Sequence, residues 1–203
     1  MTAQDTAQEV LREHGDTYAS EAGITLRNTP APLFQLLVLA LLCSTRIKAE
    51  IAVAAARELF RDGRRTPRAM ADAPWQSLVD ALGRAHYRRY DESTATALHD
   101  AGELVLDRWH GDLRRLRAEA DGSPTAVHRL LQEVPRIGPT GADIYCREAQ
   151  AVWPELRPWF DRAARAQAKS LGLPSSPERL AELVRDDQLA RLASGLVRAK
   201  LAA

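Results

Sequence analysis

The sequence predicts an all-α fold, and three observations support this class. Apolar residues recur at intervals of three and four along most of the chain, which is the period of one face of a helix. No segment alternates apolar and polar residues over more than a few positions, as a half-buried strand would. Prolines follow a hydroxyl residue in Thr66-Pro67, Ser123-Pro124 and Ser176-Pro177, and Ala73-Pro74 has the proline without the hydroxyl. Such pairs are typical of helix starts, because Ser or Thr caps the helix and proline lacks only an N–H that the first turn leaves unused.

The periodicity predicts about ten helices. The run from Leu33 to Cys43, LFQLLVLALLC, is apolar on nearly all sides and is expected to be the buried central helix. It contains a glutamine and is too short to span a bilayer. The helix expected over residues 75–82 ends at Gly83. The other expected helical segments are residues 2–13, 49–60, 92–109, 113–120 and 177–201.

Composition restricts the class of protein. The 203 residues suffice for one large domain or two small lobes, and 45% hydrophobic with 27% charged residues is typical of a soluble globular protein. The N-terminus has no basic segment that would begin a secretory signal. Cys43 and Cys146 lie far apart in apolar patterns, so we expect buried, reduced thiols and a cytoplasmic location. The absence of a C-x-x-C or His/Cys cluster argues against a zinc site or an iron–sulfur cluster.

Residues 127–152 organise the rest of the chain, and they predict a helix, a tight turn and a second helix. Pro135 ends the first helix, Gly138 closes the turn, and Pro139 occupies the first position of the second helix. A turn of this kind exposes backbone N–H groups at a helix N-terminus, which suits a phosphate. An ordinary helical hairpin that faces water explains the spacing equally well.

Residues 134–138, Val-Pro-Arg-Ile-Gly, followed by Ala142, resemble the hairpin of the helix-hairpin-helix (HhH-GPD) DNA glycosylases of the endonuclease III superfamily, apolar-Pro-x-apolar-Gly-x-x-x-Ala. That family places an aspartate and then a Leu-Gly pair downstream, which Asp161 and Leu171-Gly172 match. Residues 32–42 and 66–87 resemble its first core helix and the next segment. The resemblance covers residues 30–174 and implies a two-lobed helix-hairpin-helix DNA glycosylase fold. One lobe is expected to be 33–157, the other 1–32 plus 158–203, with an active cleft between them.

The sequence departs from the family pattern in four ways. Thr140 stands where bifunctional members carry the Schiff-base lysine, Arg136 replaces the first hairpin glycine, and Thr45 lies near the glutamine that fills the gap of a flipped base. The four-cysteine iron–sulfur motif is absent. We therefore expect a monofunctional glycosylase with no cofactor; a monovalent cation at the hairpin is possible by resemblance.

The resemblance also implies roles for individual residues. Asp161 would stabilise the positive charge on the sugar or activate water, although it can equally be the N-cap of the helix after it. The residues expected to bind DNA are those of the hairpin, the wedge loop and the basic segment 83–90. They are Arg136, Ile137, Gly138, Thr140, Gly141, Thr45, Arg46 and Arg88.

The resemblance implies an enzyme of base-excision repair that hydrolyses the N-glycosidic bond of a damaged, flipped-out base. Its partner would be double-stranded DNA containing that base; no membrane is involved, and the protein is expected to be a monomer, cytoplasmic and nucleoid-associated in a bacterium. A catalytically inactive DNA-binding protein on the same scaffold is the alternative. A helical interaction module with no nucleic-acid role is the third reading.

Overall fold

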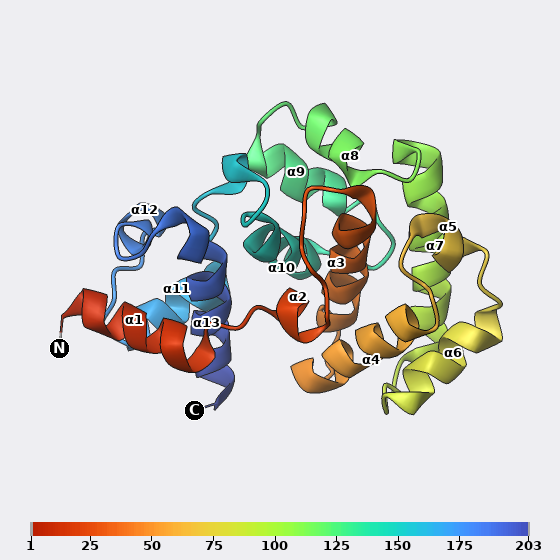
Figure 1. Cartoon of the computed structure of the whole chain (residues 1–203), viewed down its shortest axis with the longest axis horizontal. Helices are drawn as coiled ribbons and strands as arrows, with labels where there is room; N and C mark the ends of the chain where they lie inside the picture. The colour runs from red at the N-terminus through yellow and green to blue at the C-terminus, as the bar shows by residue number, and fades with distance from the viewer. Residues whose placement is uncertain (1, 203) are drawn as a thin grey trace.

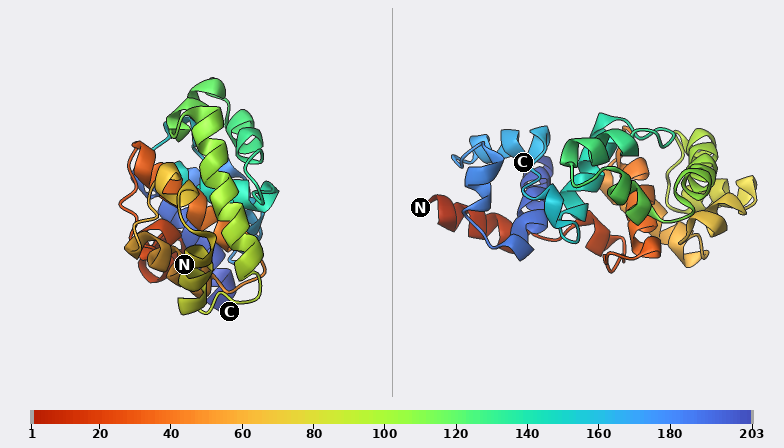
Figure 2. Two further views of the ribbon diagram at one scale, coloured as in Figure 1. Left: turned by 90° about the vertical axis from the view of Figure 1, so that its right-hand side faces the viewer. Right: turned by 90° about the horizontal axis from the view of Figure 1, so that it is seen from above.

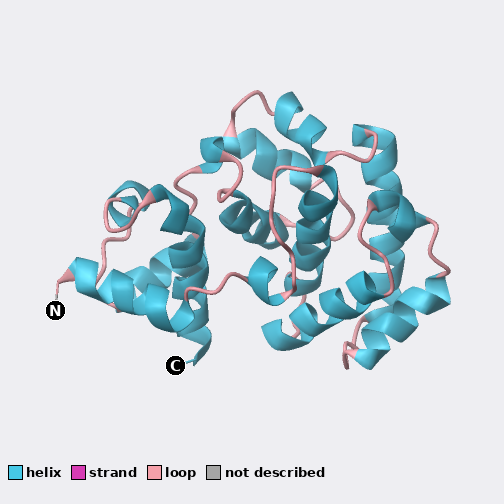
Figure 3. Cartoon of the chain, viewed as in Figure 1, coloured by secondary structure: helices cyan, strands magenta, loops and turns pink. Residues whose placement is uncertain are grey.

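The computed structural model describes residues 2–202, and within that range it contains helices and loops but no β-strand (Figure 3). This confirms the all-α prediction. No helix of this range is both long and apolar enough to cross a membrane. The described α-helices are α1 (Ala3–His14), α2 (Tyr18–Glu21), α3 (Pro30–Cys43), α4 (Ala49–Arg61), α5 (Pro67–Ala71), α6 (Trp75–Arg84), α7 (Asp91–Trp109), α8 (Leu113–Glu119), α9 (Pro124–Leu131), α10 (Pro139–Ala149), α11 (Arg162–Ser170), α12 (Pro177–Ala181) and α13 (Leu189–Ala202); the 3₁₀ helices are η1 (Pro154–Leu156) and η2 (Asp186–Gln188).

The helices gather in two groups (Figure 1). α1 and α11 to α13 form one end of the molecule, and the helices from α2 to α10 form the other, which is also clear from above (Figure 2). Each group has its own hydrophobic core. The smaller core draws on both ends of the chain, because α1 packs against α13. Tyr18, Ala19, Ala22 and Ile24 pack in the larger core. The domain boundaries themselves stay a prediction.

Helix α3 is the centre of the larger core. Its residues from Leu36 to Leu42 are all buried, so it presents no solvent face over two turns. It packs against α4 on one side and α10 on another. This agrees with the central helix expected from the run 33–43.

Two segments differ from the expected boundaries. Helix α6 continues through Gly83 to Arg84, and Pro74 is its N-cap rather than its first residue. The tail 177–201 is not one helix but α12, η2 and α13. It breaks at Arg185, whose N–H donates to Gln188 Oε1 and whose guanidinium pairs with Asp187. These local contacts start a new helix where periodicity alone predicted a continuous one.

One buried acid ties the two groups of helices together. Glu148 on α10 is 1% exposed. Its carboxylate accepts from the N–H groups of Tyr18 and Ala19 at 3.0 and 2.9 Å, and from Ser194 Oγ at 2.8 Å. Glu148 thus caps α2 from a distant part of the chain and holds α13 against α10.

We expect Glu148→Ala to lower the free energy of unfolding by about 3 kcal/mol or more, because it leaves three buried donors without an acceptor. Glu148→Gln keeps one carbonyl oxygen and should lose less. Urea unfolding followed by circular dichroism measures both. A loss below about 1 kcal/mol for the alanine variant would show that Glu148 does not join the two groups.

Candidate active site and nucleic-acid interface

The hairpin between α9 and α10 forms as the sequence predicts. Gly138 is the N-cap of α10 and Pro139 its first residue. The N–H groups of Thr140 and Gly141 lie in the first turn and have no acceptor among residues 2–202. A Cβ added to Gly138 would meet nothing within 4 Å, so the surface beside it is open to an approaching ligand. The hairpin therefore offers free donors at an accessible helix N-terminus.

Two hairpin residues show how the turn is held. Arg136, where the family has glycine, adopts the left-handed conformation with φ 63°. Ile137 is buried at 3% exposure and its N–H donates to the Val134 carbonyl, so it anchors the turn in the core and offers DNA neither a side chain nor a free donor. Arg136 thus adopts the left-handed backbone conformation that glycine would favour, at a local cost of about 1 kcal/mol.

A cleft of about 850 Å³ lies beside the hairpin. Its walls come from α10, from the start of α11, from the loop between α3 and α4, and from the end of α13. This volume is within the range of small-molecule sites. The structure brings Thr140 and Asp161 into this one cleft, although the two are far apart in the sequence. It adds Lys48 and Lys200, whose placement the sequence did not predict.

Asp161 is both a helix cap and half of a buried ion pair. Its Oδ1 accepts from the Ala164 N–H at 2.9 Å, so it is the N-cap of α11. Its Oδ2 accepts from Arg147 Nη1 at 2.6 Å, and both side chains are 4% exposed. The pair fixes the carboxylate at the cleft wall and balances its charge. Each partner needs the other, because an isolated buried charge is costly.

Arg147 was missed by the sequence analysis. It follows Cys146 in a helix whose neighbours are apolar, and its Nε is buried without a hydrogen-bond partner among the described residues. One feature of the sequence could have indicated it: two adjacent charged residues, Arg147 and Glu148, lie in a segment whose apolar residues predict a buried helix. Charges there require partners elsewhere in the fold.

A second carboxyl, that of Asp143, also lines the cleft. Its Oδ1 lies 3.2 Å from His128 Nε2 on α9. Burial raises the pKa of Asp143 above its ordinary value, the charge of Asp161 adds to that rise, and His128 opposes it. The His128 ring stacks on Trp159, with centroids 5.5 Å apart. The cleft therefore holds two carboxyl groups in different surroundings.

The loop between α3 and α4 separates the cleft from a smaller hollow. Thr45 Oγ1 is 2.7 Å from the Tyr87 hydroxyl and donates to the Leu42 carbonyl at 3.1 Å. These contacts turn Thr45 inward, so it does not project as a wedge. Arg46 is exposed and lines the smaller hollow, of about 370 Å³, together with Arg136 and Tyr90.

The third basic position, Arg88, is exposed on the loop between α6 and α7 and lines neither hollow. Within residues 2–202, Arg46, Arg88 and Arg136 have no carboxylate partner. Many other arginines do: Arg84, for example, pairs with Glu58 and Asp62. The predicted DNA-binding arginines are thus free to meet phosphates.

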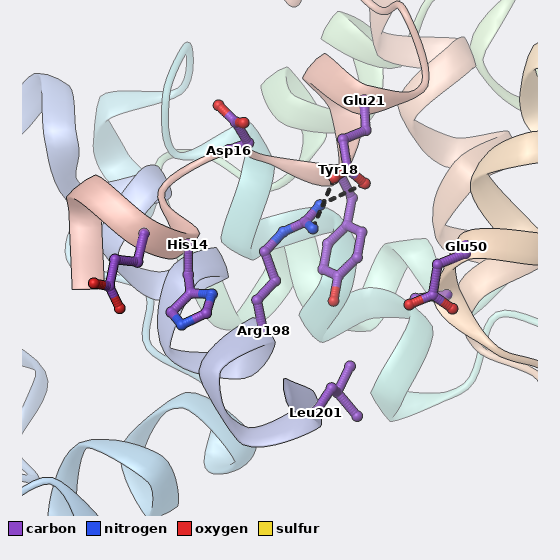
Figure 4. Close-up of a pocket in the computed structure, with 9 residues that line it drawn as sticks. His14, Asp16, Tyr18, Glu21, Glu50, Arg198 and Leu201 are labelled. Carbon is purple, nitrogen blue, oxygen red and sulfur yellow. Dashed lines mark hydrogen bonds and ion pairs between the residues drawn. The ribbon is translucent and has the colours of Figure 1, made fainter. Parts of the chain in front are cut away.

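The far side of Tyr18 has a different character (Figure 4). There Arg198 lies over the Tyr18 ring, 4.0 Å from its centroid, and pairs with Glu21 at 2.7 Å. The hollow of about 250 Å³ around them is also lined by Asp16 and Glu50. This acidic lining disfavours a phosphate in this hollow.

The two cysteines do not fit an iron–sulfur cluster. Cys146 is buried in α10 and Cys43 ends α3, and both are free thiols. Burial raises the pKa of Cys43 to about 12, which keeps it protonated. A cluster held by four thiolates cannot be assembled from these residues. That the protein works without a cofactor stays a prediction.

The described chain is all-α, with a helix-hairpin-helix beside a cleft that lies between two groups of helices. No family model matches the sequence, and neither does any curated protein. Solved structures do match, and two of them are complexes of endonuclease III with DNA. A trapped covalent intermediate, the estranged-adenine complex, matches with a TM-score of 0.56, and a non-covalent complex with a TM-score of 0.57. Each is 17% identical to this chain in sequence, and each match covers 97% of this chain and 85% of the endonuclease III chain. The chain therefore has the endonuclease III fold.

We expect Arg147→Met to lower the free energy of unfolding by about 3–5 kcal/mol, because Asp161 would remain buried without its cation. Asp161→Asn leaves Arg147 unpaired and should also destabilise the protein. The double variant should lose less than the sum, by a coupling of about 1–3 kcal/mol. Urea unfolding of the four proteins measures this cycle, and strictly additive losses would show that the pair is not formed.

Proposed function

We propose that this protein is a DNA N-glycosylase that excises a damaged base flipped out of duplex DNA. The observation that carries the proposal is the joint placement of a free-amide hairpin and the Asp161 carboxylate on one cleft. Endonuclease III, whose fold the chain shares, has been solved in complexes with DNA. The fold alone does not define an activity; these residues support this one.

The cleft suits a flipped nucleotide. An enzyme that acts on a base inside a duplex must extrude it into a pocket and offset a few kcal/mol of lost stacking. Arg46 stands on the loop between the cleft and the smaller hollow, so in this proposal it is the wedge that fills the gap. Phosphates next to the lesion would be held by the Thr140 and Gly141 amides, and by Arg88 and Arg136.

The chemistry follows from Asp161. Breaking the N-glycosidic bond builds positive charge on the sugar, and a rigid carboxylate stabilises that charge. The cap to Ala164 and the pair with Arg147 fix the Asp161 carboxylate in position before the substrate binds. Such preorganisation costs no rearrangement during the reaction.

Thr140 makes this a monofunctional hydrolase in the proposal, because a hydroxyl cannot form the Schiff base that strand cleavage needs. The amines of Lys48 and Lys200 line the cleft, and we assign them to phosphate binding. We further propose a monomer that acts where the chromosome lies, in the cytoplasm. It would need no iron–sulfur cluster, and a monovalent cation could bind the hairpin carbonyls.

A catalytically inactive DNA-binding protein is the second candidate. One observation favours it: both oxygens of Asp161 are already hydrogen-bonded and its side chain is 4% exposed. In that case the hairpin would bind DNA, and the ion pair between Arg147 and Asp161 would serve only to join the two groups of helices.

The first prediction of the proposal concerns base release. Duplexes that carry single deaminated, oxidised or alkylated bases are incubated with the protein and read with and without hot alkali. We expect strand breaks that need alkali on at least one duplex and a rate at least about 100-fold lower for Asp161→Asn. Asp107→Asn, an exposed change on α7, is the matched control and should act like the wild type.

Two outcomes decide between the candidates. If no base is released from any duplex while wild type and Asp161→Asn bind DNA equally, the protein is a binder. A covalent adduct trapped with borohydride would show that an amine such as Lys48 or Lys200 attacks the sugar, and the monofunctional assignment would be wrong. Circular dichroism of each variant verifies that it is folded.

A second prediction concerns the interface. Arg136→Ala should weaken duplex binding and reduce the slope of log K against log salt by about 1, because one phosphate contact is lost. Arg114→Ala removes the same charge from an arginine that pairs with Asp112 and lies outside the predicted interface, so it should leave the slope unchanged. Fluorescence anisotropy over a salt series measures both. Equal slopes for the two variants would place the DNA elsewhere.

A further inference from the structure

The Asp143 carboxyl has surroundings that structural needs do not explain. It lies on α10, it lines the same cleft as Asp161, and its side chain is 32% exposed, against 4% for Asp161. It caps no helix, and no lysine or arginine within residues 2–202 forms an ion pair with it. It is therefore an accessible carboxyl with no structural partner except His128.

His128 is held in a defined orientation beside Asp143. Gln132 Nε2 donates to the His128 carbonyl at 3.1 Å and lies 3.2 Å from His128 Nδ1. An amide nitrogen only donates, so Nδ1 is the acceptor and the proton of the neutral imidazole sits on Nε2. Nε2 lies 3.2 Å from both the Pro139 carbonyl oxygen and Asp143 Oδ1. With Trp159 stacked on the ring, the N–H is aimed at the Asp143 carboxylate and at the hairpin.

The two carboxyl groups of the cleft have different partners. The guanidinium of Arg147, which is always charged, balances the charge of Asp161, whereas the ion-pair partner of Asp143 is the imidazole of His128. Asp143 also has the exposed surface that a water molecule needs in order to reach it. Two carboxyl groups whose environments differ in this way usually have different roles in a reaction.

We infer that Asp143 is the proton-transfer residue of the cleft and that His128 is its positioning residue. This rests on the proposed glycosylase function. The ionised Asp143 carboxylate accepts a proton from water as the water oxygen bonds to C1′. The C1′–N bond breaks, and its electron pair leaves with the base. The proton then passes from Asp143 to the departed base, so one water is consumed and the carboxylate is restored. Asp161, held by Arg147, stabilises the sugar charge.

The expected pH dependence follows from the groups that face Asp143. These are His128 from α9, Asp161 at the start of α11, and Arg147 on α10 itself. Burial raises the pKa of Asp143 most, and His128 lowers it. The reaction needs the ionised form, so the rate should fall as the pH drops through this pKa. Removing His128 should raise the pKa and move the fall to higher pH.

The test is the pH profile of single-turnover base release, measured with protein in excess on whichever duplex the wild type processes. Asp143→Asn should be slower by about 100- to 10,000-fold and should lose the acidic fall in rate. His128→Phe keeps a ring against Trp159 but has no N–H, and its acidic fall should lie at higher pH than that of the wild type. Asp107→Asn should reproduce the wild-type profile.

Each result supports or overturns the inference. A rate and profile for Asp143→Asn that match the wild type would overturn it while leaving the glycosylase proposal intact. An unshifted profile for His128→Phe would remove His128 from the mechanism. A wild type that releases no base from any duplex would refute both the glycosylase proposal and this inference. Because Asp143 is partly exposed and caps no helix, its asparagine variant should keep the wild-type circular dichroism spectrum and duplex affinity.

Discussion

Two adjacent buried charges on α10 constrain the whole molecule. Arg147 and Glu148 lie inside the protein, where an unpaired charge is costly, so each requires partners from other parts of the chain. Arg147 forms an ion pair with Asp161 at the start of α11. The Glu148 carboxylate accepts hydrogen bonds from the first backbone amides of α2 and from a hydroxyl on α13. The terminal helices must therefore return to α10. This return closes the smaller group of helices against the larger one.

The same constraint places the candidate site. Because Asp161 pairs with Arg147, the start of α11 lies beside α10, and both helices line the cleft. The cleft is then lined by the hairpin residue Thr140 and by the carboxyl groups of Asp143 and Asp161. A residue that is fixed by a cap and an ion pair is also preorganised, so these contacts are compatible with the proposed catalytic role of Asp161.

The sequence was sufficient for most of the helices and for the hairpin, because these depend on local spacing and on prolines at helix starts. It did not reveal the partners of buried charges. Periodicity does not show which residue pairs with Arg147, and only the fold brings it to Asp161. Likewise Thr45 looked available as a wedge, but its partner Tyr87 is 42 residues away along the chain. The Asp143–His128 contact joins two helices across the hairpin, so neither residue signals it alone.

The central claim is that this cleft is complementary to a positively charged sugar. The most direct measurement compares the affinity of the protein for two duplexes that differ at one abasic position, a cationic pyrrolidine or a neutral tetrahydrofuran. The account predicts binding at least about 10-fold tighter to the pyrrolidine duplex, with that preference reduced in Asp161→Asn and in Asp143→Asn. Equal affinity for the two duplexes in the wild type would contradict it and leave a protein that binds DNA without acting on it.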